Sequence, residues 1–263
     1  MVNPSVRILH NLARSGGTVI GKCLGCMSEV VLLSEIHQDV MTMYPNDTHP
    51  VTQALNWGII TLQDLEGKRL TIIDAVKLIE EKCTSQNKKL VLRDFAYLDF
   101  IGMPIVKPPS FRLMLAEILS YEFEVIQFAI VRHPVDQWLS MINSTPVFLK
   151  VSLDVYLKGY LEFGKQIQSC GFIRYEDFAK EPEKQMEYLC DKLRLRFDRT
   201  FVARWASYNK ITGDLDCKKS RAASLQRIAQ LPRRPMEEEL KKHFRNNSNS
   251  REAIELLDYG DIE

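Results

Sequence analysis

The stretch ILHNLARSGGTVIGKCLGC, residues 8–26, joins an apolar run to a pair of glycines that open a helical pattern. A buried strand, a tight Gly-rich turn and a helix, in that order, are typical of phosphate-binding units in parallel α/β proteins. Three kinds of ligand fit the residue types in this stretch: a nucleoside triphosphate, a metal or redox partner, and a phosphate group bound without a metal.

The first interpretation rests on the spacing Gly16-x-x-x-x-Gly21-Lys22, which approaches the P-loop of nucleoside triphosphatases. A full P-loop continues with Ser or Thr, whose hydroxyl binds Mg²⁺, but this chain has Cys23. Because a thiol is a poor ligand for so hard a cation, this interpretation lacks its metal ligand. The simpler alternative is that Lys22 and Cys23 already lie inside the helix.

The second interpretation uses Cys23 and Cys26, which have the spacing of a metal or redox pair. No second pair and no histidine cluster accompanies them, and such cysteines are usually small core residues. The sequence therefore indicates no metal site. The six cysteines are scattered, which favours reduced thiols over a disulfide framework; they are residues 23, 26, 83, 170, 190 and 217.

The third interpretation needs only what the stretch Arg14-Ser15-Gly16-Gly17-Thr18 supplies. A Gly-rich turn at a helix N-terminus exposes backbone N–H groups, which bind a phosphate through hydrogen bonds and the helix dipole. Arg14 adds a fixed positive charge beside the turn, and no magnesium ion is required. The competing explanation is a glycine turn that only connects a strand to a helix.

The chain has 263 residues, of which 45% are hydrophobic and 26% charged, which is ample for one domain with a packed core. Strands alternate with helices along it, and this order predicts a three-layer α/β sandwich with a central parallel sheet. Strands are expected at residues 5–13, 29–36, 88–94, 123–132 and 171–178. Helices are expected at residues 17–27, 70–83, within 108–122, 133–142, 152–170 and 182–195.

The segments outside this pattern differ in composition. Residues 39–64 contain Pro45, Pro50 and several turn formers, so a long loop or insertion is expected there. Residues 207–235 form a basic, loop-rich segment, and 236–263 are expected to be a helical or frayed tail. The expected organisation is thus a single α/β domain over residues 1–235, followed by that tail.

Net charge and hydropathy argue against two classes of partner, duplex nucleic acid and the interior of a membrane. The formal net charge of +1 does not resemble the basic balance of a protein that binds duplex nucleic acid. No apolar run approaches the roughly 18 residues of a membrane span. The segment MVNPSVRILHNL lacks the layout of a signal peptide, so a soluble, cytoplasmic protein is expected. Its oligomeric state cannot be inferred from the sequence.

A second strand-then-helix unit, FAIVRHPVDQWLS at residues 128–140, places Arg132 at a strand end and Ser140 inside a helix. Together with the first turn and FIRYEDFAKEP at 172–182, it resembles the sulfotransferases that use 3′-phosphoadenosine 5′-phosphosulfate (PAPS). The resemblance covers most of residues 5–235 and rests on the combination and order of the motifs. It implies the P-loop NTPase-like fold of those enzymes and transfer of a sulfuryl group to an acceptor hydroxyl, with adenosine 3′,5′-bisphosphate as product.

The resemblance also implies cofactor-binding residues. The first turn would bind the 5′-phosphosulfate, Arg132 and Ser140 the 3′-phosphate, and Tyr175 would lie near the adenine. The residues of the first turn are Arg14, Ser15, Gly16, Gly17, Thr18 and Val19. The basic C-terminal segment would add Lys210, Gly213, Lys218 and Arg221, although a solvated basic loop explains these equally well. Cytosolic members have Trp where this chain has Val19, so one surface for stacking the adenine is missing.

Catalysis of sulfuryl transfer depends mainly on positioning and on stabilising charge at the leaving phosphate oxygen, as in phosphoryl transfer. Arg14 and the N–H groups of residues 16–18 are placed to stabilise that charge. Many relatives also have a histidine base just after the third strand, where this chain has Phe95.

The candidate bases are therefore Glu35, His37 and Asp94, in that order of preference. Each follows or ends a strand, and ligands of parallel sheets bind outside the carboxyl ends of the strands. Some relatives use a glutamate after the second strand, which favours Glu35. A salt bridge or a helix cap is the alternative role for each of the three residues.

The acceptor is expected to be a small molecule, but the sequence does not identify it. Apolar and aromatic residues near the expected pocket hint at a lipophilic or aromatic acceptor, and could equally belong to the core: Tyr44, Trp57, Tyr97, Phe100 and Met103. Two other functions stay open at this point. One is a small-molecule or nucleotide kinase, which would require magnesium. The other is a non-catalytic nucleotide-binding relative, in which Val19 and Phe95 mark a decayed site.

Overall fold

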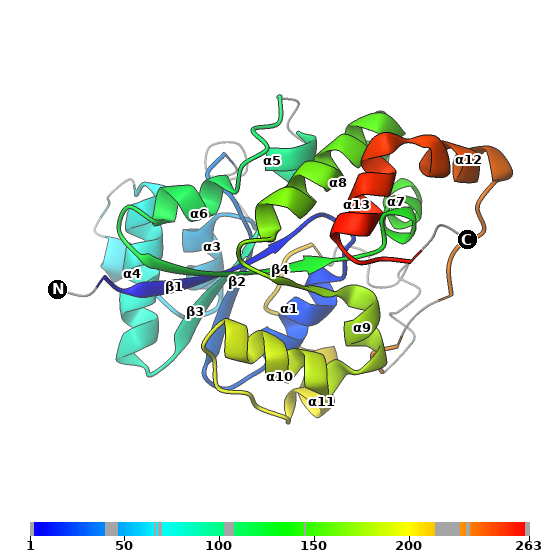
Figure 1. The fold of residues 1–263 in the computed structure, drawn as a ribbon. Helices are drawn as coiled ribbons and strands as arrows, with labels where there is room; N and C mark the ends of the chain where they lie inside the picture. The colour runs from blue at the N-terminus through cyan, green and yellow to red at the C-terminus, as the bar shows by residue number, and fades with distance from the viewer. Residues whose placement is uncertain are drawn as a thin grey trace.

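The computed structural model describes residues 3–39, 47–65, 67, 70–102, 108–144, 146–213, 227–229 and 232–260. These residues form a five-stranded sheet in the order β2-β3-β1-β4-β5, with every neighbouring pair parallel (Figure 1). The strands are β1 (Ser5–Asn11), β2 (Val30–Ile36), β3 (Lys89–Asp94), β4 (Glu124–Val131) and β5 (Phe172–Arg174). The parallel sheet predicted from the alternating pattern is confirmed.

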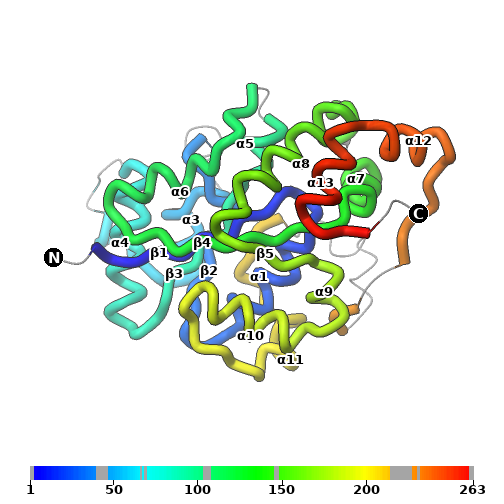
Figure 2. Tube along the Cα trace, viewed as in Figure 1, coloured from blue at the N-terminus to red at the C-terminus, as the bar shows by residue number. Residues whose placement is uncertain are grey.

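Helices cover both faces of the sheet, as Figure 2 shows along the Cα trace. One face packs against α1 (Gly17–Gly25), α9 (Tyr175–Lys180), α10 (Pro182–Lys192) and α11 (Phe201–Arg204). The other face packs against α3 (Pro50–Asn56), α4 (Ile72–Ser85), α5 (Tyr97–Ile101), α6 (Met114–Leu119), α7 (Pro134–Ile142), α8 (Leu153–Ile167), α12 (Glu238–Asn246) and α13 (Ser248–Leu256). Short 3₁₀ turns lie at Leu62–Leu65, Pro146–Lys150 and Trp205–Ser207.

The two cores follow from the two-residue period of the strands. In β1, Ile8 belongs to the core beneath α8, whereas its neighbour Leu9 belongs to the core beneath α1. Leu92 and Val91 of β3 divide in the same way. Successive side chains of a strand point to opposite faces, so a strand covered on both faces must be apolar at nearly every position. The three-layer sandwich is therefore confirmed, and its reason is visible in the strand sequences.

All five strands end at one edge of the sheet because they run in parallel. β1 pairs with β3 through Ile8 and Leu92, and with β4 through Leu9 and Phe128. The turns that follow β1, β4 and β5 therefore begin side by side. This edge is where a parallel sheet places its ligands.

The fifth strand is shorter than the sequence pattern predicts. We expect a strand over residues 171–178, but β5 ends at Arg174 and α9 begins at Tyr175. Two carboxylates, those of Glu176 and Asp177, lie in the first turn of α9, where the helix dipole stabilises negative charge. The early helix start places the Tyr175 ring at the edge of the sheet instead of within a strand.

The expected long loop over residues 39–64 is wrong for its second half, because Pro50–Asn56 form α3. The sequence carried a signal for this helix. HPVTQ at 49–53 repeats HPVDQ at 133–137, which starts α7. In both helices the His side chain accepts a hydrogen bond from the N–H two residues on, at 3.2 Å in α3 and 3.3 Å in α7, and proline occupies the first helical position. Residues 40–46, with Tyr44 and Pro45, lie outside the described residues.

Gln53 shows why α3 lies where it does. This buried side chain accepts a hydrogen bond from the Ser34 N–H at 2.9 Å and donates one to the Ser34 carbonyl at 2.8 Å. β2 is the edge strand of the sheet, and an amide side chain that pairs with its backbone takes the place of a further strand.

The C-terminal residues 238–256 form α12 and α13, and α13 packs along α8 (Figure 1). Phe244 and Leu257 are fully buried in the same core as the sheet. Two of the aromatic residues considered for the acceptor pocket, Tyr97 and Phe100, also lie fully buried in this core. Among the described helices, none combines the length and apolarity needed to cross a membrane.

Candidate functional site

The Gly-rich turn between β1 and α1 is short and tightly bonded. Ser15 is buried, and both its N–H and its hydroxyl donate to the Leu12 carbonyl, at 3.3 and 2.8 Å. Arg14 and Gly16 have left-handed φ angles of 67° and 94°. The chain thus reverses within residues 12–16 and enters the helix at Gly17.

Both glycines of the turn are required by close contacts. A Cβ on Gly16 would lie 2.1 Å from Cδ2 of the Tyr175 ring, and one on Gly17 would lie 2.6 Å from the side-chain amide of Asn11. Carbon atoms cannot approach so closely, so any other residue would force these neighbours to move. The absence of side chains lets Tyr175 and Asn11 pack directly against the backbone of the turn.

The start of α1 offers hydrogen-bond donors. The first backbone hydrogen bond of the helix runs from the Ile20 N–H to the Gly16 carbonyl at 3.1 Å. The N–H groups of residues 17–19 therefore have no intrahelical acceptor, and the positive end of the helix dipole lies beside them. Donors that lack an intrahelical acceptor suit a phosphate or phosphosulfate group, which is the ligand that the sequence analysis expects at this turn.

Predicted site residues from three separate turns meet here. The Arg14 Nε donates to the Ser140 Oγ at 3.2 Å, and the Arg132 Nη1 donates to the Arg14 carbonyl at 3.1 Å. The Arg132 guanidinium also lies over the Tyr175 ring, 5.2 Å from its centroid. The structure thus brings Arg14, Gly16, Arg132, Ser140 and Tyr175 into one cluster, contributed by the carboxyl ends of β1, β4 and β5.

A buried polar network, which the sequence analysis missed, holds these turns together. The Gln137 Nε2 donates to the Ala13 carbonyl at 2.6 Å, and the Tyr156 hydroxyl contacts the Gln137 Oε1 at 3.2 Å. Gln137 and Tyr156 are fully buried. Gln137 corresponds to Gln53 in the repeated HPVxQ pattern, and each of the two amides bonds the backbone of a neighbouring segment. The repeated HPVxQ pattern is the feature of the sequence from which this role of Gln137 could have been predicted.

Glu35 lies on the neighbouring part of the edge. The register of β2 against β3 shifts between Ser34 and Ile36, and Glu35 has a left-handed φ of 57°. A β-bulge of this kind redirects the side chain of the extra residue. The Glu35 Oε1 lies 3.8 Å from the Nη2 of Arg93, a buried arginine of β3 that the sequence analysis did not select.

The segment that ends at Gly213 packs against the residues around this carboxylate. The Arg93 Nη2 donates to the Thr212 carbonyl at 3.0 Å, and the Thr212 N–H donates to the Ser34 Oγ at 2.7 Å. A Cβ on Gly213 would lie 2.2 Å from the Glu35 Oε1. Gly213 therefore contacts the candidate base, whereas the resemblance implied a role in cofactor binding.

The other two candidate bases are enclosed. The His37 Nε2 pairs with Asp99 at 3.2 Å, and burial raises the pKa of the Asp99 carboxyl group. The Asp94 Oδ2 pairs with the His10 Nδ1 at 2.7 Å. Both candidate side chains, His37 and Asp94, have no exposed surface, whereas that of Glu35 is 20% exposed.

No family model matches this sequence, and neither does any curated protein sequence. The structure, however, superposes over its full length on known proteins. A sulfotransferase domain from the curacin biosynthetic pathway matches with a TM-score of 0.64 at 16% identity, and the match covers 99% of both chains. The chain has the sulfotransferase fold. This confirms the fold that the resemblance implied.

Two further sulfotransferases align with lower scores. The enzyme from Alicyclobacillus acidocaldarius gives a TM-score of 0.49 at 10% identity, covering 99% of this chain and 98% of the other. Mouse sulfotransferase SULT7A1, in a complex with PAP, gives 0.43 at 13% identity, covering 98% and 89%. The assignment of the sulfotransferase fold rests on the curacin-pathway domain.

Within the sulfotransferase fold, the remaining predicted residues lie as follows. Thr18 and Val19 are half-buried in the first turn of α1. The Lys210 Nζ donates to the Trp57 carbonyl at 3.1 Å, at the C-terminal end of α3. Lys218 and Arg221, like Met103 of the expected acceptor region, lie outside the described residues.

The residues of the incomplete P-loop and of the cysteine pair lie inside α1. Gly21, Lys22 and Cys23 follow the first turn of the helix instead of forming its N-terminal loop. Cys23 is fully buried, and burial raises its pKa well above the ordinary value of a thiol. In the described part of the chain, no group of three or more His, Cys, Asp and Glu side chains could hold a metal ion.

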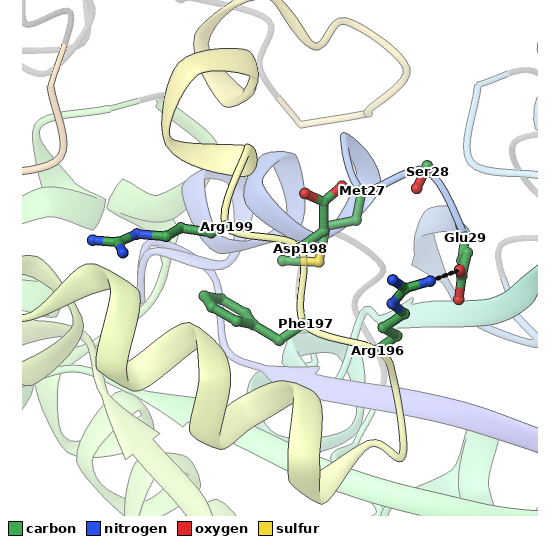
Figure 3. A pocket seen from close by; sticks show the side chains of 7 residues that line it. All are labelled: Met27, Ser28, Glu29, Arg196, Phe197, Asp198 and Arg199. Atoms are coloured by element: carbon green, nitrogen blue, oxygen red, sulfur yellow. Dashed lines mark hydrogen bonds and ion pairs between the residues drawn. The ribbon is translucent and has the colours of Figure 1, made fainter.

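A surface pocket lies away from this cluster, at the other end of α1 (Figure 3). It is lined by Met27, Ser28, Glu29, Arg196, Phe197, Asp198 and Arg199. The Arg196 guanidinium pairs with Glu29 at 3.1 Å. Because α1 has nine residues, and a helix rises about 1.5 Å per residue, the pocket is separated from the Gly-rich turn by the length of the helix.

Proposed function

We propose that this protein is a sulfotransferase that moves a sulfuryl group from PAPS to the hydroxyl group of a small-molecule acceptor. The observation that supports this most strongly is the direct contact between the two expected phosphate sites. Arg14 from the Gly-rich turn bonds Ser140, and Arg132 bonds the Arg14 backbone, at 3.2 and 3.1 Å. Two arginines beside one helix N-terminus suit a nucleotide that carries phosphate groups at two positions.

The 5′ side of the nucleotide would be held by the N-terminus of α1. Bound PAPS supplies the sulfuryl group, whose bond to the 5′-phosphate oxygen breaks as the bond to the acceptor oxygen forms. Arg14 and the N–H groups of residues 17–19 would then stabilise the negative charge on the departing phosphate oxygen. Donors fixed by the tight turn need no rearrangement during the transfer.

The 3′ side would be held by Arg132 and the hydroxyl of Ser140. The Tyr175 ring is buried between Gly16 and the Arg132 guanidinium, beside the two expected phosphate sites. This position next to the expected nucleotide site supports the role of Tyr175 near the adenine.

Glu35 would accept the proton of the acceptor hydroxyl. Its carboxylate is partly exposed at the carboxyl edge of the sheet, and the β-bulge sets its direction. Arg93 and the backbone of Gly213 contact the same carboxylate and restrict its orientation. A positioned base is typically worth about 10²–10⁴-fold in rate.

The direct test is nucleotide selectivity. We expect adenosine 3′,5′-bisphosphate to bind without magnesium and at least about tenfold more tightly than AMP, because charge-assisted contacts to a second phosphate contribute about 1.5–3 kcal/mol. Isothermal titration calorimetry with the two nucleotides measures the difference, and ATP with Mg²⁺ serves as the comparison for a kinase. Equal affinity for both adenosine nucleotides would contradict the proposal.

A pair of substitutions separates the roles of the two arginines. Arg132→Ala is expected to weaken binding of adenosine 3′,5′-bisphosphate and to raise KM, because that contact is made in the ground and transition states alike. Arg14→Ala is expected to lower mainly kcat, because Arg14 faces charge that grows during transfer. Steady-state kinetics with varied PAPS distinguish the two effects.

The matched control for both variants is Arg199→Ala, which removes the same charge from the pocket at the far end of α1. It should change neither constant. A change in KM alone for Arg14→Ala would exclude the role proposed for that residue.

A further inference from the structure

A half-buried carboxylate, that of Glu176, lies behind the 3′ side of the cluster. The Glu176 Oε1 accepts a hydrogen bond from the His133 N–H at 3.0 Å, and its Oε2 accepts one from the Tyr259 hydroxyl at 3.2 Å. Glu176 begins α9 beside Tyr175, whereas Tyr259 follows α13, near the C-terminal end of the described chain. The Glu176 carboxylate therefore links His133 to Tyr259, a residue 83 positions after Glu176 in the sequence.

The group that Glu176 holds belongs to the peptide unit between Arg132 and His133. The N–H of this unit donates to Glu176, and its carbonyl accepts a hydrogen bond from the Tyr160 hydroxyl at 2.7 Å. With both polar ends bonded, one to the half-buried Glu176 and the other to the buried Tyr160, the two hydrogen bonds oppose rotation of this peptide plane. Its orientation fixes the direction in which the Arg132 side chain leaves the backbone, toward Arg14 and Tyr175.

Tyr259 is itself held from several sides. Its ring packs edge-on against the His133 ring, with centroids 5.2 Å apart, and the Arg174 guanidinium lies 5.7 Å from its centroid. Arg174 also donates to the backbone carbonyl of Asp258. Burial raises the pKa of the Tyr259 phenol well above its ordinary value, so the hydroxyl remains a neutral donor.

Glu176 has a second possible partner in the Arg132 guanidinium. Burial raises the pKa of its carboxyl group, and the positive charge of Arg132 acts on it in the opposite direction. A carboxylate that lost its Tyr259 donor would have an unsatisfied oxygen in a partly buried environment, and Arg132, whose charge already acts on this carboxylate, could satisfy it. Arg132 would then be drawn toward Glu176 and away from a bound phosphate.

We propose that Tyr259 and Glu176 are positioning residues for Arg132, so that the segment after α13 forms part of the support of the 3′-phosphate site. This inference rests on the proposed function, because it assigns a partner to the arginine expected to bind the 3′-phosphate. The C-terminal residues then contribute to nucleotide selectivity without contacting the nucleotide.

The test uses Tyr259→Phe, which removes one hydroxyl and keeps the ring contacts. Binding of adenosine 3′,5′-bisphosphate and of AMP is measured by calorimetry on the full chain. We expect the variant to bind the bisphosphate about three- to tenfold more weakly, the fold-change that corresponds to the net contribution of one ordinary hydrogen bond, and to bind AMP with unchanged affinity. AMP is the internal reference, since a general loss of folded protein would affect both nucleotides. Tyr121→Phe, at a tyrosine that is 81% exposed, is the matched control and should alter neither affinity.

A double-mutant cycle with Glu176→Gln tests whether the two residues act through one hydrogen bond. If they do, the double variant loses about as much bisphosphate affinity as the more affected single variant. Additive losses, or an unchanged ratio of the two affinities in Tyr259→Phe, would overturn the inference. A wild-type protein that binds AMP and the bisphosphate equally would instead refute the proposed function, and the inference with it. The Glu176→Gln arm also gives the answer should Tyr259→Phe fold poorly.

Discussion

Replacing Glu35 with Gln is expected to lower kcat by about 10²–10⁴-fold for an alcohol acceptor, while the affinity for adenosine 3′,5′-bisphosphate stays unchanged. Gln has the same size and keeps the contact with Arg93, but it cannot take the proton of the acceptor hydroxyl. A phenol with a low pKa should be affected less, because its proton is lost more easily. Turnover measured with both acceptor types, beside nucleotide titrations of the same variant, checks the expectation.

The two enclosed candidates provide the comparison. His37→Ala and Asp94→Asn are expected to lower the free energy of unfolding by about 1–3 kcal/mol each, because Asp99 and His10 lose a buried partner. Turnover per folded molecule should remain near that of the wild type. Normal turnover in Glu35→Gln together with a collapse in either comparison variant would transfer the role of the base to that residue.

Gly16→Ala is expected to lower the free energy of unfolding by roughly 2–6 kcal/mol and to abolish tight nucleotide binding. The φ of 94° is strained for any residue with a Cβ, at a cost of about 1–3 kcal/mol. The new Cβ would also overlap the Tyr175 ring, and overpacking of this kind costs about 1–3 kcal/mol. Urea unfolding and calorimetry measure the two consequences separately.

Gly58→Ala is the matched control, because Gly58 also has a positive φ, of 71°, but no atom lies within 4 Å of its would-be Cβ. Gly58→Ala should lower the free energy of unfolding by the cost of backbone strain alone, without the cost of overlap, and it should leave nucleotide binding unchanged. In the double variant of Gly16→Ala with Tyr175→Ala, the loss of stability should be smaller than the sum of the two single losses, because the truncated side chain no longer overlaps the new Cβ. Equal losses in Gly16→Ala and Gly58→Ala would mean that the contact with Tyr175 is unimportant.

The sequence by itself determined the layered fold. Strands buried on both faces are rich in apolar residues, and amphipathic helices carry a 3.6-residue period, so both kinds of element can be recognised in a single sequence. The Gly-rich turn could be recognised as well, because a glycine pair between a strand and a helix is typical of a tight turn. The elements that were missed or misjudged are short: α3, α5, α11 and the end of β5 each depend on local contacts more than on a long periodic pattern.

The tertiary structure alone decided how the candidate site is assembled. Arg14 and Ser140 are 126 positions apart in sequence, and Glu176 and Tyr259 are 83 apart, so no local pattern links either pair. Arg93 is a further example. In the sequence it is only one residue of a buried strand, and the structure shows that the bulge at Glu35 places a carboxylate beside it. Periodicity records which face of an element is buried. It does not record which other element covers that face, because that choice is made by the packing of the whole chain.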